Sequence, residues 1–346
     1  MESLSVKYRP QSFETLCGQN SIKKILMRQL ETKQFNNCYL FCGPSGCGKT
    51  TVARIFAHKI NEYTDSNGNL CSSEPIEIDG ASNNGVDNVK AIIQSANVRS
   101  LDGKYKVYII DETHALTSQA WQAFLKCIEE PPAYTIFIFC TTDPQKLPNT
   151  ILNRMMRFNF TRLTTETIRN NLLNICAMEH LTNYTEACDY ISRMSNGGMR
   201  DAISLLDKCA QYSTDLSITN VLEAIGHFSY DILFNLVNAL VDGQEAAVLK
   251  LIADIYQEGT DLKLFVNQLL HFCLDVNKYA IFKSIEMTSL PNTLEEQLKY
   301  SVGFENATGY YMYVINKLIE CKSLIKDDTD IKTTIEVCLL NICKLL

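Results

Sequence analysis

Residues 43–50 read Gly43-Pro-Ser-Gly-Cys-Gly-Lys-Thr50 and match the phosphate-binding pattern G-x-x-x-x-G-K-[ST]. The glycines let the backbone curl so that its N–H groups can point at phosphate oxygens. Lys49 would place a cation on the β- and γ-phosphates, and the hydroxyl of Thr50 would bind Mg²⁺. We therefore expect an ATP and Mg²⁺ site made by Gly43, Ser45, Gly46, Cys47, Gly48, Lys49, Thr50 and Thr51.

The residues around this loop alternate between strand-like and helix-like patterns. The apolar run 37–42 predicts a buried strand that leads into the loop, and residues 48–60 predict a helix whose N-terminal dipole favours anions. Further short apolar runs lie at 75–79, 106–111 and 135–142, separated by helix-like pieces such as 118–130. This alternation predicts a parallel sheet flanked by helices.

Two acids end one of these predicted strands, about 60 residues after the phosphate-binding loop. An apolar strand followed by Asp111-Glu112 is a Walker B arrangement. Asp111 would hold the Mg²⁺ shell, and Glu112 would polarise the attacking water. His114 is interpreted as structural rather than catalytic.

Other polar residues could read or stabilise the transferred phosphate. Thr142, at the end of the neighbouring predicted strand, is the first candidate for a γ-phosphate sensor, and Thr141 is the second; an ordinary strand threonine is the alternative. Arg154 and Arg200 are the cationic candidates, because the transition state of phosphoryl transfer spreads negative charge over its oxygens. Each of them alone would by default be a surface arginine.

Strand-like patterns stop after about residue 162. Three helices are predicted over 165–180, 186–195 and 198–212, and the pattern is helical throughout from about 227. We expect three domains: an α/β nucleotide-binding domain over 1–162, a small helical lid over 163–226 and an all-α collar over 227–346 that holds subunits together.

Composition limits the classes of function. The net charge of −7 argues against a general nucleic-acid binder, yet residues 1–60 carry nine Lys/Arg against three Asp/Glu. Residues 227–346 contain ten lysines, no arginine and 16 acids, so they are the poorer host for a polyanion. Neither a membrane-spanning run nor a secretory signal is predicted, and we expect a cytoplasmic protein, or one of the host cytoplasm if the source is viral.

Several short stretches of the sequence resemble those of a known family. Residues 7–19 (KYRPQSFETLCGQ), the phosphate-binding loop, IIDETH, CIEEPP, TTDPQKLPNTILNR and GGMRDAISLLDK occur in the order and spacing of the motor subunit of bacterial clamp loaders, the tau/gamma type of AAA+ ATPase. The resemblance is dense over residues 4–210 and rests on helical character beyond them. It implies an ATPase of the DNA polymerase III holoenzyme that opens a sliding clamp and loads it onto primed DNA during replication.

The resemblance also assigns roles to single residues. It places Tyr8, Arg9 and Pro10 at the adenine end of the nucleotide site and makes Arg200 the sensor 2 of the lid. Arg154 resembles the trans-acting arginine finger, which the family carries in a Ser-Arg-Cys triplet and which here stands in Asn-Arg-Met.

The implied partners are the sliding clamp, other loader subunits in a pentameric ring, and primer-template DNA, with no membrane. The family usually inserts a four-cysteine zinc module after the phosphate-loop helix. Here residues 62–75 contain only Cys71, so we expect no zinc. The tail domains of the longer family form, which bind helicase and polymerase, are not expected.

Two other functions remain open. One is another AAA+ remodeller of DNA, such as a branch-migration motor, although the arginine-free helical third lacks an obvious DNA-reading module. The other is a non-hydrolysing structural subunit that presents Arg154 to a neighbour, although the intact loop and the Asp111-Glu112 pair argue against it.

Overall fold

The computed structural model describes residues 2–64, 70–99, 104–326 and 328–343. The chain divides into two compact units, one made of residues 1–175 and 191–207 and the other of 176–190 and 208–346. Each unit is described by itself below. The three domain boundaries expected from the sequence remain predictions.

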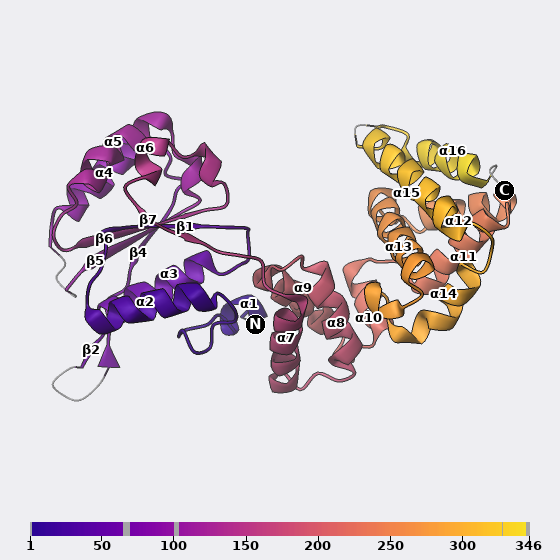
Figure 1. Cartoon of the computed structure of the whole chain (residues 1–346), viewed down its shortest axis with the longest axis horizontal. Helices are drawn as coiled ribbons and strands as arrows, with labels where there is room; N and C mark the ends of the chain where they lie inside the picture. Colours follow the sequence, from indigo (N-terminus) through magenta and orange to yellow (C-terminus); the bar gives the residue numbers. More distant parts are fainter. Residues whose placement is uncertain (1, 65–69, 100–103, 327, 344–346) are drawn as a thin grey trace. The chain divides into compact units, whose positions relative to one another are not determined.

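The first unit contains a five-stranded parallel sheet in the order β4-β5-β6-β1-β7 (Figure 1). Its strands are β1 (Cys38–Cys42), β4 (Ile76–Asp79), β5 (Lys106–Asp111), β6 (Thr135–Thr141) and β7 (Met156–Asn159). Every residue of β1 and β6 is buried, as continuous apolar runs in a parallel sheet should be. The predicted sheet is confirmed, with β7 as an additional edge strand.

Helices cover both faces of this sheet because alternate strand residues point to opposite sides (Figure 1). Tyr39 and Phe41 of β1 pack with α2 (Asn20–Thr32) and α3 (Lys49–Ile60). Leu40 packs on the other side with α4 (Val86–Ala96) and α5 (Ser118–Glu129). Helix α5 ends at Glu129, two residues before Pro131, which cannot continue a helix.

Short elements complete the first unit. They are α1 (Leu4–Lys7), η1 (Thr113–Ala115), η2 (Pro144–Lys146) and α6 (Asn149–Leu152). Helices α7 (Thr165–Met178), α8 (Tyr184–Met194) and α9 (Met199–Tyr212), the three predicted after residue 162, are each divided between the two units.

The region for which the resemblance implies a zinc module forms a two-stranded antiparallel ladder, β2 (Tyr63–Thr64) with β3 (Leu70–Cys71). Residues 65–69 and the side chain of Cys71 lie outside the described residues. The absence of zinc therefore stays a prediction.

We expect protein purified without added metal to contain far less than one zinc per chain, because a closed structural site needs four nitrogen or sulfur ligands. Elemental analysis after gel filtration measures the content. One equivalent of zinc that resists dialysis against a chelator would contradict the expectation.

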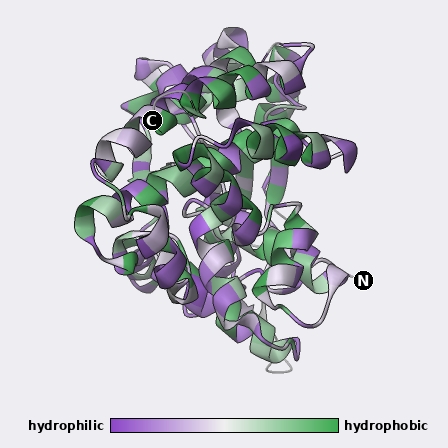
Figure 2. Cartoon of the chain, turned by 90° about the vertical axis from the view of Figure 1, so that its right-hand side faces the viewer, coloured by the Kyte–Doolittle hydropathy of each residue, from purple (hydrophilic) through white to green (hydrophobic). Residues whose placement is uncertain are grey.

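The second unit is helical. Besides its parts of α7, α8 and α9 it contains α10 (Ile218–Ile225), α11 (Tyr230–Val241), α12 (Glu245–Gln257), α13 (Leu262–Phe282), η3 (Ile285–Met287), η4 (Asn292–Leu294), α14 (Glu295–Ser301), α15 (Ala307–Leu324) and α16 (Ile331–Cys343). Buried side chains from α11 to α16 form one apolar core, in which Phe265 and Tyr311 are fully buried. Figure 2 shows hydrophobic and hydrophilic residues interspersed on these helices, as amphipathic packing requires.

Among the described residues, no single helix is both long and apolar enough to cross a membrane, and only the bent pair α10 and α11 meets those criteria jointly.

Candidate functional site

The phosphate-binding loop joins the carboxyl end of β1 to the amino end of α3. Gly48 precedes the helix with φ of 97°, a conformation that L side chains rarely adopt. Lys49 is 7% exposed, and its Nζ donates hydrogen bonds to the carbonyl oxygens of Gly43 and Pro44, each at 2.8 Å. The loop thus holds the ammonium group against its own backbone, beside the N–H groups that open α3.

The two residues expected to bind Mg²⁺ are in direct contact, Thr50 from the amino end of α3 and Asp111 from the carboxyl end of β5. Thr50 Oγ1 donates a hydrogen bond to Asp111 Oδ2 at 2.6 Å, and Asp111 Oδ1 accepts from the N–H of Glu112 at 2.9 Å. A hydroxyl and a carboxylate are the hard oxygen donors that Mg²⁺ prefers. No group of three or more His, Cys, Asp and Glu side chains that could hold a metal occurs in the described part of the chain. This donor set therefore fits an ion held jointly by protein and phosphate oxygens.

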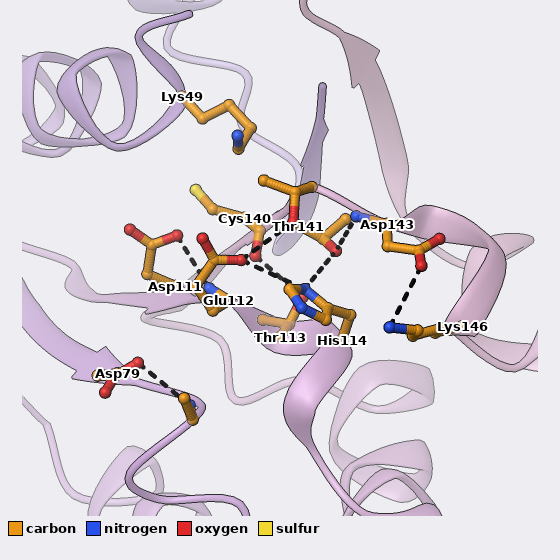
Figure 3. A network of polar contacts seen from close by, with 12 residues as sticks. Lys49, Asp79, Asp111, Glu112, Thr113, His114, Cys140, Thr141, Asp143 and Lys146 are labelled. Carbon is orange, nitrogen blue, oxygen red and sulfur yellow. Dashed lines mark hydrogen bonds and ion pairs between the residues drawn. The ribbon is translucent and has the colours of Figure 1, made fainter. Parts of the chain in front are cut away.

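Glu112 follows Asp111 at the end of β5 and has a left-handed backbone, with φ of 47°. Thr142 Oγ1, from the neighbouring strand end, donates to Glu112 Oε2 at 3.3 Å. His114 Nδ1 lies 3.2 Å from the same oxygen (Figure 3). The Walker B glutamate is thus in contact with the first sensor candidate and with His114, for which the sequence indicates a structural role.

The start of α9 touches the phosphate-binding loop. Met199 N donates to Gly46 O at 3.0 Å, and a Cβ on Gly46 would lie 3.1 Å from Gly198 Cα. The close approach explains why glycines stand on both sides of this contact. It also brings Arg200, the second residue of α9, to the candidate nucleotide site.

A cavity of about 160 Å³ lies within the first unit over this loop. Its wall includes most of the predicted site residues: Tyr8, Arg9, Pro10, Ser45, Gly46, Cys47, Gly48, Lys49, Thr50, Thr51, Asp111, Glu112 and Arg200. Gly43 and Thr142 are outside the described wall but contact Lys49 and Glu112, respectively. Arg154 is also outside it; its Nη2 lies 2.9 Å from Glu129 Oε1 on the surface.

Further residues of the wall were not predicted. Arg54 lies one turn after Thr50 on α3, and this i, i+4 spacing on one helix face is the signal that could have found it. Its Nη2 pairs with Glu77 Oε2 of β4 at 2.5 Å. The rest of the wall is made of the apolar residues Leu16, Leu163, Met199 and Ile203, together with Ser5, Cys17 and Asn171.

Positive charge gathers in this cavity. Burial, and after it the charges of Arg54 and Arg200, lower the pKa of Arg9, while Glu77 acts in the opposite direction. An arginine nonetheless stays protonated at neutral pH. With Lys49, four cationic side chains line the cavity against the two acids Asp111 and Glu112, which suits a polyphosphate.

Three family models match the chain in succession. The model described as DNA polymerase III, delta subunit matches residues 18–164, and DNA polymerase III clamp loader subunit, ATPase lid domain matches 167–214. DNA polymerase III subunits gamma and tau domain III matches 216–345.

The chain is similar to named bacterial proteins. DNA polymerase III subunit tau of Bacillus subtilis is 37% identical over 293 residues, which cover 81% of this chain and 52% of the relative. DNA polymerase III subunit gamma/tau of Mycoplasma genitalium is 33% identical over 329 residues, which cover 91% and 54%. The chain thus spans about half the length of the curated relatives it matches.

Among solved structures, the RuvB Holliday junction branch migration motor of Thermotoga maritima superposes with a TM-score of 0.52 at 19% identity, covering 68% of this chain and 79% of that one. This likeness shows the fold alone. Taken with the family models and the relatives, it identifies the first unit as an AAA+ nucleotide-binding fold. The chain belongs to the gamma and tau family of DNA polymerase III clamp-loader subunits.

Proposed function

We propose that this chain is an ATP-hydrolysing motor subunit of a clamp loader. The observation that carries the proposal is the contact of Thr50 Oγ1 with Asp111 Oδ2, in a cavity that Lys49 and Glu112 also line. A cation for the phosphates, two oxygen donors for a metal and a carboxylate for the attacking water converge there.

Each residue has a defined part in this reaction. Lys49 and the N–H groups at the start of α3 bind the β- and γ-phosphates, while Arg200 contacts them from α9. Thr50 and Asp111 would hold Mg²⁺, which neutralises phosphate charge when bound. Glu112 orients the attacking water and accepts its proton. Tyr8, Arg9 and Pro10 hold the base end.

The proposal includes the assembly around this site. Residues 227–346 would form the collar that joins subunits in a five-membered ring, residues 163–226 the lid and residues 1–162 the ATPase domain. The partners would be the other loader subunits, a sliding clamp and primer-template DNA. Phosphate contacts on the DNA would come from the basic first 60 residues, because the arginine-free collar region carries 16 acids.

The two other functions are less well supported. A structural subunit that only presents Arg154 would not need Lys49, Thr50, Asp111 and Glu112 around one cavity. A branch-migration motor shares the AAA+ fold, but the model for gamma and tau domain III matches residues 216–345.

Glu112→Gln tests the proposal directly. ATP turnover by the assembled complex should rise when clamp and primed DNA are added together. Glu112→Gln should lower that turnover by about 10²- to 10⁴-fold, because an amide cannot accept the proton of the attacking water. The affinity for a labelled ATP analogue should stay near the wild-type value.

Glu130→Gln is the matched control, since Glu130 is an exposed acid at the end of α5 outside the described cavity wall. A Glu112→Gln complex that turns over ATP at the wild-type rate would refute the assigned role. Wild-type turnover that responds to DNA junctions but never to the clamp would favour a remodeller.

A further inference from the structure

His114 lies in η1, directly after the Walker B acids, and is partly buried, with its side chain 22% exposed. Its Nδ1 is 3.2 Å from Glu112 Oε2 and 3.3 Å from Thr141 Oγ1 (Figure 3). One ring nitrogen therefore connects the end of β5 to the end of β6, the strand that ends in the sensor candidate Thr141 and is followed directly by Thr142.

The chemistry of these groups sets the direction of the contacts. A carboxylate can only accept hydrogen bonds, so the approach of Nδ1 to Glu112 is a hydrogen bond when Nδ1 carries a proton. Thr141 Oγ1 also accepts from Asp143 N at 3.0 Å, which ties the same hydroxyl to the loop after β6. With Thr142 Oγ1 as the second donor, Glu112 Oε2 receives two hydrogen bonds from this side.

Glu112 needs such support. Its backbone has a positive φ, which is uncommon for a residue other than glycine, and its side chain is 42% exposed. A long, half-exposed carboxylate without fixed partners would sample several rotamers. Donors on Oε2 restrict it while the residue still lines the cavity.

We propose that His114 is a positioning residue for hydrolysis: its Nδ1–H holds the Glu112 carboxylate in the orientation that activates water and links it to the strand that senses the γ-phosphate. The inference rests on the proposed ATPase function. His114 does not contact ATP in this proposal, and its effect on hydrolysis passes entirely through Glu112.

The test compares two substitutions of nearly equal shape in the full chain, in the assembled complex. His114→Asn keeps an N–H donor close to the place of Nδ1, whereas His114→Leu fills similar space without any donor. We expect His114→Leu to lower kcat by about tenfold or more, because a small misplacement of a catalytic group is costly. KM and the Kd of an ATP analogue should not change, and His114→Asn should recover most of kcat.

A double-variant cycle separates positioning from a general structural role. If His114 acts only through Glu112, His114→Leu should cost nothing further in a Glu112→Gln background. His58→Leu is the control, because His58 pairs with Ser72 and Glu74 on the surface and lies outside the described cavity wall. Thermal unfolding midpoints of all variants monitor folding.

Wild-type kcat in His114→Leu would overturn the inference. So would equal losses in the leucine and asparagine variants, or a further loss in the double variant. A wild-type complex that binds ATP but never hydrolyses it would instead refute the proposed function, and the role of His114 with it.

Discussion

Replacing Lys49 with alanine is expected to remove most of the affinity of the chain for ATP. The Lys49 side chain is almost fully buried, and its ammonium group is held by Gly43 O and Pro44 O at the edge of the cavity. Alanine removes the cation nearest the phosphate-binding loop and leaves the bound phosphates with an unpaired charge. Truncating one partner of a buried charge pair typically costs about 2–5 kcal/mol, or roughly 30- to several-thousandfold in Kd.

Equilibrium binding of a fluorescent ATP analogue measures this loss. Thermal unfolding gives a second measurement, because a ligand at about 100 times its Kd stabilises the folded state by about 2.7 kcal/mol. The wild-type chain should gain that stability when ATP and Mg²⁺ are added, and the Lys49→Ala chain should gain far less.

Lys59→Ala is the matched control. Lys59 stands on the same helix α3, where its Nζ pairs with Glu62 Oε1 at 2.8 Å outside the described wall of the cavity. Its removal should leave the affinity for ATP unchanged. Normal binding of the analogue by Lys49→Ala would show that the cavity is not the ATP site.

An element could be predicted from the sequence where its own residues form a recognisable apolar run or a local motif. Strands β1 and β6 are continuous apolar runs because both their faces are covered, and the glycine loop between β1 and α3 has a local motif. Strand β7 was missed because only Phe158 of its four residues is buried, which leaves no recognisable period. Its extended form depends on pairing with β1, where Met156 lies opposite Tyr39.

The same distinction applies to the site. The phosphate-binding loop and the Asp111-Glu112 pair could be predicted because their chemistry lies in adjacent residues. The contacts of Glu112 with Thr142 and His114 depend on β5 and β6 being neighbours in a particular register, with Ile110 opposite Phe139. Residues that meet between neighbouring strands have no characteristic separation along the chain, so a single sequence does not reveal such contacts.

Arg154→Ala should retain the affinity for ATP but lose nearly all turnover. Arg154 follows α6, and its guanidinium lies outside the described wall of its own cavity, so within the proposed function it can act only on a neighbouring subunit's nucleotide. Its ion pair with Glu129 joins two side chains that are 41% and 46% exposed. Exposed pairs of this kind are worth about 0–1 kcal/mol, so the arginine can leave Glu129 for a phosphate at little cost.

An arginine supplied to the transition state of phosphoryl transfer is worth roughly 10³–10⁵ in rate, and a loss of that order is expected in steady-state ATPase assays of the assembled complex. Arg157→Ala is the control, because Arg157 is an exposed arginine of β7 whose Nε donates to Asn159 Oδ1 at 2.8 Å. The complex with Arg157→Ala should hydrolyse ATP at the wild-type rate.

Mixing the two inactive variants tests whether a site is shared between subunits. An Arg154→Ala subunit still binds ATP, and a Lys49→Ala neighbour still presents Arg154, so a mixed assembly contains some complete sites. Turnover should therefore recover in part when the two are assembled together, whereas each alone stays inactive. If Arg154→Ala alone keeps full turnover, a complete site needs nothing from the neighbouring subunit. If mixed assemblies form without any recovery of turnover, the neighbour's Arg154 does not restore the site. Either result would show that Arg154 does not act across the subunit boundary.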